Sequence, residues 1–165
     1  MGIREPLGEL GCGLSHALEV MGERWSFLIL RAAFNGLYHF EEFSDELGIA
    51  RNILSNRLAK LVENGVLERT PCETDRRKVE YRLTEKGLGL LPAMLALRQW
   101  GEKYADICNR DLILVDCKNG QPVKTIGIRA HDDRELGWHE LGWQTPDKIG
   151  TPVERQDHAY SKENA

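Results

Sequence analysis

The sequence contains few cysteines, and their spacing matches no common metal or disulfide motif. The four cysteines are Cys12, Cys72, Cys108 and Cys117, and no two of them form a CxxC pair. This spacing does not support a closed zinc site or a disulfide framework. We therefore predict no bound metal, no cofactor and reduced thiols.

Long hydrophobic runs are also missing from these 165 residues. No apolar stretch approaches the length of a membrane span, and the first residues, MGIREPLGELG, lack the apolar core of a signal peptide. We therefore expect a soluble, cytoplasmic protein with no membrane partner. The length is sufficient for one domain with a hydrophobic core and extensions.

An overall excess of positive charge is absent too, because the formal net charge is −4 at pH 7. This value argues against a general coat for nucleic acids, but the distribution of charge is more informative than its sum. The segment 131–165 carries eight acidic and four basic residues, which accounts for the whole net charge. The rest of the chain is balanced, and its positive charge is concentrated within residues 51–78.

Residues 40–64 show two helical patterns joined by a short turn. Phe40, Phe43 and Leu47 lie on one face of a first helix, and Gly48 is its expected stop. A second helix is expected from near Ala50 to about residue 64. The apolar stripe of this second helix consists of Leu54, Leu58, Leu61 and Val62.

The opposite face of the second helix is polar and carries Asn52, Asn56, Lys60 and Glu63. Amide side chains can pair with base edges and cations with phosphates, so this face suits a DNA groove. The alternative is a two-helix piece of any helical domain with a solvated polar face, because such patterns are easily mimicked. The two helices alone do not decide between these interpretations.

A hairpin pattern follows directly and favours the DNA-binding interpretation. Residues 66–70 and 79–84 alternate with the period of strands, and the loop between them ends in Arg76, Arg77 and Lys78. A hairpin with a cationic tip after a helix-turn-helix predicts a winged helix. The helix enters one groove, and the wing reaches the neighbouring backbone or minor groove.

Helices are predicted on both sides of this motif. Residues 14–21 form a short amphipathic helix, and residues 25–34 form an almost wholly apolar one. Thr84 is expected to cap a helix that runs to about Cys108, with a kink or interruption at Pro92. Because this helix carries apolar residues on more than one face, we predict that it forms a homodimer interface with the N-terminal segment. A helix folded back onto the core of a monomer is the alternative.

The C-terminal part of the chain is predicted to be an extension. Residues 112–117 and 123–128 flank Asn119-Gly120, a strong hairpin signal. From residue 131 onward the sequence is polar and rich in turn formers, so we expect a disordered or loosely docked tail. The predicted boundaries are a winged helix-turn-helix domain with a dimerisation helix over 1–108, a β-hairpin extension over 109–130 and an acidic tail over 131–165.

Across about Cys12 to Tyr104 the sequence resembles the HxlR family of bacterial transcriptional regulators, which are relatives of the MarR-type winged helices. The matching pieces are a cysteine opening the first helix, GERWSFLILR, FEEFSDELGIARNILSNRLAKLVENGVLER, and VEYRLTEKG with LLPAMLALRQWGEKY. The resemblance implies a homodimer that binds double-stranded DNA at a pseudo-palindromic operator, with one winged helix per half-site. It places DNA reading on the second helix and the wing. The predicted contact residues are Arg51, Asn52, Ser55, Asn56, Arg57, Lys60, Arg76, Arg77 and Lys78.

The chain departs from the family pattern at two places. Ala50 and Arg51 replace a frequent Ser-Pro, and because alanine is a poor helix cap, the second helix is expected to start less firmly. Longer family members carry a C-terminal hairpin with paired cysteines. Cys117 has no CxxC partner, so zinc is not expected in that extension.

Cys12 is the predicted redox-sensing residue. It precedes a helix, where unpaired backbone N–H groups and the helix dipole favour a thiolate. The resemblance implies the same role, because several family members sense oxidants or electrophiles through a cysteine at this position. Gly13, however, replaces the proline that often follows that cysteine. A small apolar residue packed at the start of the helix is the alternative.

The sequence therefore predicts an α+β fold, mainly α, with a winged helix-turn-helix, terminal dimerisation helices and a C-terminal β-hairpin. The leading function is a sequence-specific, homodimeric transcriptional regulator that responds to thiol oxidation or electrophiles. A winged-helix protein-interaction module without specific DNA binding is the alternative. An enzyme is not expected, because the histidines are scattered and no Ser/His/Asp or Cys/His arrangement can be argued from their spacing. The sequence does not identify an operator or a small-molecule effector.

Overall fold

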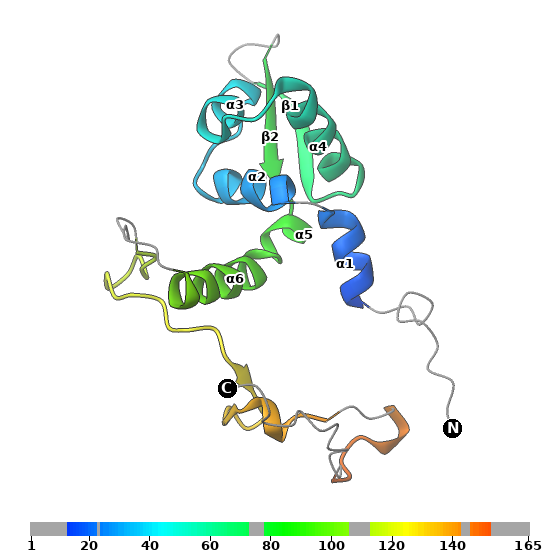
Figure 1. Cartoon of the computed structure of the whole chain (residues 1–165), viewed down its shortest axis with the longest axis vertical. Helices are drawn as coiled ribbons and strands as arrows, with labels where there is room; N and C mark the ends of the chain where they lie inside the picture. Colours follow the sequence, from blue (N-terminus) through cyan, green and yellow to red (C-terminus); the bar gives the residue numbers. More distant parts are fainter. Residues whose placement is uncertain (1–12, 23, 73–77, 106–112, 143–145, 153–165) are drawn as a thin grey trace. The chain divides into compact units, whose positions relative to one another are not determined.

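The computed structural model describes residues 13–22, 24–72, 78–105, 113–142 and 146–152 (Figure 1). The chain divides into two compact units, residues 1–110 and residues 111–165. The predicted fold class, mainly α with a winged helix-turn-helix, is confirmed by the order of helices and by the hairpin that follows them.

Four helices open the first unit: α1 (Gly13–Met21), α2 (Arg24–Phe34), α3 (Phe40–Leu47) and α4 (Arg51–Glu63). Their bounds agree with the helical patterns of the sequence. Gly48 after α3 and Gly65 after α4 have left-handed φ angles of 56° and 67°, which let the backbone turn out of each helix. Ala50 offers no side-chain cap to α4, as expected of alanine.

The N-terminus of α3 is held by a carboxylate from its own first turn. Oε2 of Glu42 accepts hydrogen bonds from the backbone N–H groups of His39, at 2.8 Å, and Tyr38, at 3.0 Å. These bonds, that of His39 first, lower the pKa of Glu42. Two backbone donors at the helix start are thereby satisfied, so the start of α3 is fixed.

The hairpin predicted after α4 consists of β1 (Leu67–Pro71) and β2 (Val79–Leu83), which pair antiparallel. The pairing continues past the strand ends, because the N–H of Cys72 donates to the carbonyl of Lys78 at 2.9 Å. Residues 73–77, at the tip, lie outside the described residues.

A short segment before α3 pairs with the other edge of β2, which the sequence patterns did not predict. The N–H of Tyr81 donates to the carbonyl of Tyr38 at 2.8 Å, and His39 forms an antiparallel bridge to Glu80. The helix-turn-helix and the wing are therefore joined by backbone hydrogen bonds as well as by the chain itself.

The core of the first unit lies between α2, α3, α4 and the base of the hairpin. Its largest fully buried apolar side chains are Ile29, Leu30, Phe43, Leu54, Leu58, Leu61, Val66 and Leu67. The leucines of α4 belong to the predicted stripe, whose edge residue, Val62, is half-buried. Truncation of one such leucine to alanine costs about 2–5 kcal/mol. Burial of this stripe therefore fixes which face of α4 remains exposed.

The predicted interruption at Pro92 separates two helices. α5 (Glu85–Leu88) is capped as expected by Thr84, whose Oγ1 accepts the N–H of Gly87 at 3.1 Å. α6 (Leu91–Tyr104) has Pro92 in its first turn. Proline is tolerated there, because an N–H group in the first turn would form no hydrogen bond within the helix. α6 ends before the predicted boundary at Cys108, which lies outside the described residues.

No residue of α6 is buried within the chain. Leu90 and Met94 pack against the core, whereas Leu97, Trp100 and Tyr104 are 56%, 65% and 63% exposed. The far part of α6 therefore does not fold back onto the core of its own chain, which was the alternative to a dimer interface.

The second unit has little regular structure among its described residues. Val115 bridges Pro122 around the predicted Asn-Gly turn, and the N–H groups of Asp116 and Val123 donate to the carbonyls of Gln121, at 2.9 Å, and Leu114, at 3.0 Å. The described residues therefore pair as a short hairpin without the two long strands predicted there. β3 (Ile128–Arg129) pairs instead with β4 (Glu135–Leu136). The apolar side chains of the predicted strands, such as Ile113, are exposed, and a strand without a packed face gains little stability.

The sequence predicts a disordered or loosely docked tail from residue 131 onward. The described residues of this segment, 131–142 and 146–152, contain β4 and two 3-10 turns, η1 (Trp138–Glu140) and η2 (Pro146–Lys148). Glu140 accepts the N–H of Gly137 at 2.8 Å and pairs with Arg134 at 2.6 Å, and these contacts lower its pKa. Such short elements carry no hydrophobic period. Residues 153–165 lie outside the described residues.

Within the part of the chain that the structure describes, no helix has both the length and the apolar character that crossing a membrane requires.

Candidate nucleic-acid interface

The exposed face of α4 carries the predicted base-reading residues. Asn52, Ser55 and Asn56 are all exposed, and spacings of three and four residues place them on one side of the helix. Because the leucine stripe is buried on the other side, this face cannot turn inward. β1 lies beside α4 in Figure 1, so the helix and the wing are neighbours within the same domain.

Arg51, at the start of α4, is exposed but held by α3. Its guanidinium donates to both carboxylate oxygens of Glu41, at 2.5 and 2.8 Å, and lies 4.7 Å from the centroid of the Phe40 ring. The hydrogen bond from Arg51 lowers the pKa of Glu41, and the same bond raises the pKa of Arg51. A phosphate would therefore have to compete with Glu41 for this arginine.

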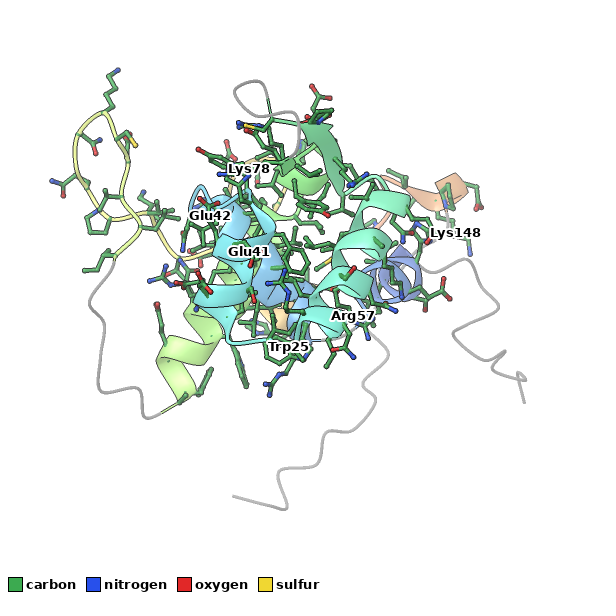
Figure 2. All side chains as sticks on the ribbon, turned by 90° about the horizontal axis from the view of Figure 1, so that it is seen from above. Trp25, Glu41, Glu42, Arg57, Lys78 and Lys148 are labelled. Atoms are coloured by element: carbon green, nitrogen blue, oxygen red, sulfur yellow. The ribbon has the colours of Figure 1, made fainter. Side chains whose placement is uncertain are left out.

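Two other predicted contacts on α4 are turned partly inward. Arg57 is half-buried, and its Nε atom is buried (Figure 2). The ammonium of Lys60 lies near the C-terminal end of α1, where a Cβ added to Gly22 would be 3.4 Å from Nζ. A cation is favourable beside the carbonyls of a helix C-terminus. Both side chains therefore support the fold in addition to their predicted contact with DNA.

The basic side chains of the wing differ in whether they are exposed to a DNA phosphate or already paired within the protein. Lys78 is exposed beside β2 (Figure 2), whereas Arg76 and Arg77 lie outside the described residues. Arg82 pairs with Glu80 at 2.6 Å and stacks over Tyr38 at 4.6 Å from the ring centroid, so its charge is used within the fold.

Two exposed residues lie outside the predicted contact set. Ile53 on α4 is 38% exposed, and Arg69 is exposed on β1. An apolar side chain in the major groove can contact a thymine methyl group, and an arginine on the wing can reach a phosphate. Ile53 was missed because it adjoins the buried Leu54. Arg69 was missed because strand alternation does not show which face is open.

The sequence of this domain matches known regulators. Residues 20–108, more than half of the chain, match the profile of the HxlR-like helix-turn-helix family. The chain is 48% identical over 94 residues to Rv3095 of Mycobacterium tuberculosis, which is named an uncharacterized HTH-type transcriptional regulator. That match covers 57% of this chain and 60% of Rv3095, so the chain spans less than two thirds of the relative.

Two solved structures show the same fold. PA1607, described as a candidate transcription factor, has a TM-score of 0.77 at 41% sequence identity, covering 83% of this chain and 96% of that one. The redox regulator HypR in its reduced form has a TM-score of 0.53 at 30% identity, covering 58% of this chain and 95% of that one.

Proposed function

The chain belongs to the HxlR-like helix-turn-helix family, and on this premise we propose that it is a sequence-specific DNA-binding transcriptional regulator that acts as a homodimer. The observation that carries the proposal is the exposed amide face of α4, with Asn52 and Asn56 one turn apart above a fully buried leucine stripe. The regulators that the chain resembles support the same function.

In the proposed complex, α4 enters the major groove. Asn52, Ser55 and Asn56 face base edges, with Ile53 beside them, because amides and hydroxyls can donate and accept hydrogen bonds there. The wing follows the neighbouring backbone or minor groove, where Arg69, Arg76, Arg77 and Lys78 meet phosphates. Arg51 reaches a phosphate by exchanging its contact with Glu41.

The proposed dimer is formed by α6 and the N-terminal segment. Leu97, Trp100 and Tyr104 on α6 and Leu14 and Leu18 on α1 are more than half exposed, although large apolar side chains gathered on a surface usually mark an interface. A two-fold dimer would present two α4 helices to half-sites about one helical turn apart, roughly 34–36 Å.

We further propose that the regulator responds to oxidants or electrophiles through Cys12. The described part of α1 starts at Gly13. The sequence pattern places Cys12 directly before this helix, where the backbone donors at a helix start favour a thiolate. Cys12 itself lies outside the described residues. HypR, whose fold and sequence are similar, is a redox regulator with structures in reduced and oxidized forms. Modification at Cys12 would shift the spacing of the two α4 helices and so change operator affinity.

Electrophoretic mobility shifts with genomic fragments, measured over a series of salt concentrations, test the function. A DNA-binding regulator gives a shift whose affinity falls linearly with salt on a log-log scale, because bound counterions are released. A protein-interaction module gives no such shift, and that result would overturn the proposal. A double Asn52→Ala, Asn56→Ala variant is the matched control, because both side chains are exposed and their loss leaves the core intact.

A further inference from the structure

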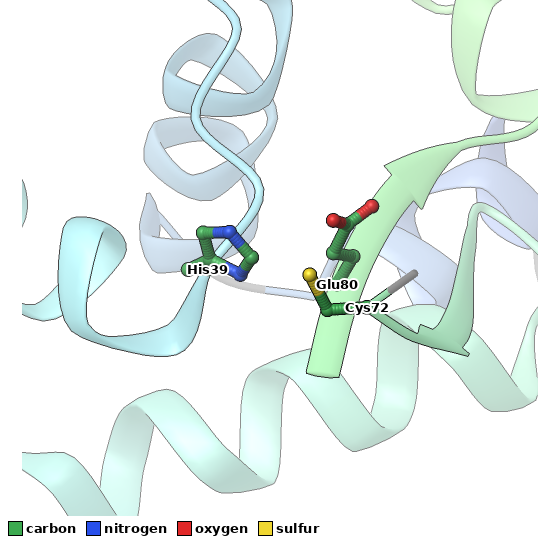
Figure 3. Close-up of side chains that lie close together, drawn as sticks. All are labelled: His39, Cys72 and Glu80. Atoms are coloured by element: carbon green, nitrogen blue, oxygen red, sulfur yellow. The ribbon is translucent and has the colours of Figure 1, made fainter. Parts of the chain in front are cut away.

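Three side chains with metal-binding atoms meet at the loop end of the hairpin, where β1 ends and β2 begins (Figure 3). They are His39 before α3, Cys72 after β1, and Glu80 in β2. Their ligand atoms all lie within 4.8 Å of one another. Cys72 is 6% exposed, and the Glu80 side chain is 13% exposed.

Backbone pairing, rather than the choice of side-chain rotamers, brings these residues together. Glu80 lies opposite Thr70 in the hairpin, and Cys72 follows Thr70 by two residues, so both side chains project from the same face. His39 lies opposite Glu80 on the other side of β2 through its antiparallel bridge, which places it on that face as well. The cluster is therefore built into the register of the fold.

The histidine is oriented as a metal ligand. Its Nδ1 lies 3.2 Å from the carbonyl oxygen of Val79. In the neutral tautomer that donates from Nδ1 to this carbonyl, Nε2 holds the lone pair. Metal-bound histidines usually donate their other N–H to a carbonyl or carboxylate in this way.

The carboxylate and the thiol also suit coordination. Nε and Nη2 of Arg82 both bond to Oε2 of Glu80, at 2.7 and 2.6 Å, so Oε1 can bind a metal while Arg82 holds the group in place. The Cys72 thiol hydrogen-bonds to the same carboxylate. On metal binding the thiol would lose its proton to solvent and the sulfur would bind as a thiolate.

We propose that His39, Cys72 and Glu80 form a binding site for Zn²⁺, with a water molecule as the fourth ligand. Nitrogen, sulfur and carboxylate oxygen are the donors that zinc takes, at about 2.0–2.3 Å in a tetrahedral arrangement. Tetrahedral ligands at these lengths lie roughly 3.4–3.6 Å apart, and the three ligand atoms already lie within 4.8 Å of one another, so no pair must approach by more than about 1.4 Å. Rotation of the half-buried His39 and Glu80 side chains supplies this movement.

The site would tie the start of α3 to both strands of the wing. Zinc binding would therefore fix the angle between the wing and the helix-turn-helix. The absence of CxxC spacing hid this site in the sequence, because its ligands come from three separate elements. The inference about binding is independent of the proposed DNA-binding function, since its test does not use DNA.

Cobalt(II) substitution tests the site directly. The full chain carries Cys12→Ser, Cys108→Ser and Cys117→Ser, so that Cys72 is the sole thiol, and is freed of metal by chelation under reducing conditions. Titration with Co²⁺ should give one equivalent per chain, a thiolate-to-cobalt charge-transfer band and visible bands of tetrahedral intensity. Added Zn²⁺ should bleach these bands.

Three variants in the otherwise wild-type chain, one of them a control, separate a metal site from a hydrogen-bonded cluster. Cys72→Ser should lose the charge-transfer band, whereas Cys117→Ser, which alters an exposed cysteine in the other unit, should keep it. Glu80→Gln should keep the thiolate band but weaken binding at least tenfold. Circular dichroism confirms that each variant is folded, and Glu80→Gln decides the question if Cys72→Ser does not fold.

The proposal is overturned if the folded protein with Cys72 as its sole thiol shows no charge-transfer band. It is equally overturned if Cys72→Ser retains the wild-type band, or if Glu80→Gln binds Co²⁺ as tightly as wild type. In each of these cases the three side chains form only a hydrogen-bonded cluster that stabilises the wing.

Discussion

Arg51, the first residue of α4, forms a bidentate ion pair with Glu41 in the first turn of α3. The guanidinium donates to both carboxylate oxygens, at 2.5 and 2.8 Å. The pair places a negative charge beside the N-terminus of the helix that we propose reads DNA. Glu41 therefore limits both the availability of Arg51 and the attraction of this surface for phosphate.

Replacing Glu41 should strengthen DNA binding. In Glu41→Gln the guanidinium of Arg51 becomes available to a phosphate, so affinity should rise on all sequences. The log-log salt dependence should become steeper by about one. Fluorescence anisotropy with a labelled duplex over a salt series measures both effects.

Glu46→Gln is the matched control, because Glu46 also lies on α3 but pairs with Arg31 of α2 at 3.2 Å. Equal gains in both variants would mean that only net charge matters. The hydrogen bond from Arg51 lowers the pKa of Glu41, so the pair is present above the ordinary carboxyl range and is lost as pH falls through the lowered value. The effect of Glu41→Gln should thus be constant over about pH 6–8.

Asn56 and Lys78 should affect DNA binding in different ways. Asn56→Ala should change the preference between operators by roughly 1–3 kcal/mol for a lost bidentate base contact. Lys78→Ala should weaken binding to all sequences alike and reduce the salt slope by about one, as should Arg76→Ala and Arg77→Ala. Competition between a selected operator and a scrambled duplex separates the classes. The assignment is wrong if both classes lose affinity equally on every sequence.

The exposed apolar face of α6 should control assembly. Leu97→Glu or Trp100→Glu should convert the proposed dimer to a monomer, because a charge would replace a side chain that is 56% or 65% exposed in the single chain. Light scattering at micromolar concentration measures the mass. Ile53→Glu, which alters an exposed apolar residue on α4, should remain dimeric. A wild-type monomer under these conditions would contradict the proposed interface.

Gly87 should tolerate no side chain. A Cβ at this position would lie 2.3 Å from the carbonyl oxygen of Val66, so α5 would have to move away from the base of β1. We expect Gly87→Ala to destabilise the fold by about 1–3 kcal/mol in urea unfolding. Gly13→Ala is the control, because no atom of the described residues lies within 4 Å of a Cβ added there. It should change the free energy of unfolding by less than about 1 kcal/mol.

Oxidation should alter operator binding through Cys12. Wild-type affinity should change after mild peroxide or diamide treatment and recover with reductant, whereas Cys12→Ser should show no response. Cys72→Ser tests the other thiol near the DNA-binding region and should respond as wild type does. If wild-type binding is unaffected, or Cys12→Ser responds equally, Cys12 is not the sensor.

The periodic parts of this fold were predictable from the sequence. The leucine stripe of α4, the stop at Gly48 and the cap at Thr84 depend on contacts within a few residues of the chain, and the structure has all of them. The short β3 and β4 strands were missed because no alternation marks them.

Contacts between distant segments could not be predicted. The pairing of His39 with Glu80 depends on the register of three separate segments. The Arg51–Glu41 pair depends on the angle between α3 and α4. These two contacts determine which charged side chains are exposed without a partner in the protein. For this reason the sequence could name candidate DNA-contact residues but could not order them by their availability to DNA.

Selection of genomic DNA fragments bound by the full chain, followed by sequencing, tests the central claim most directly. For wild type we predict enrichment of sites with two inverted half-sites whose centres are about 10–10.5 base pairs apart. This enrichment should be lost in the Asn52→Ala, Asn56→Ala variant. Recovery of no sequence above the input, or the same enrichment with the double variant, would contradict the proposal that the exposed face of α4 reads DNA.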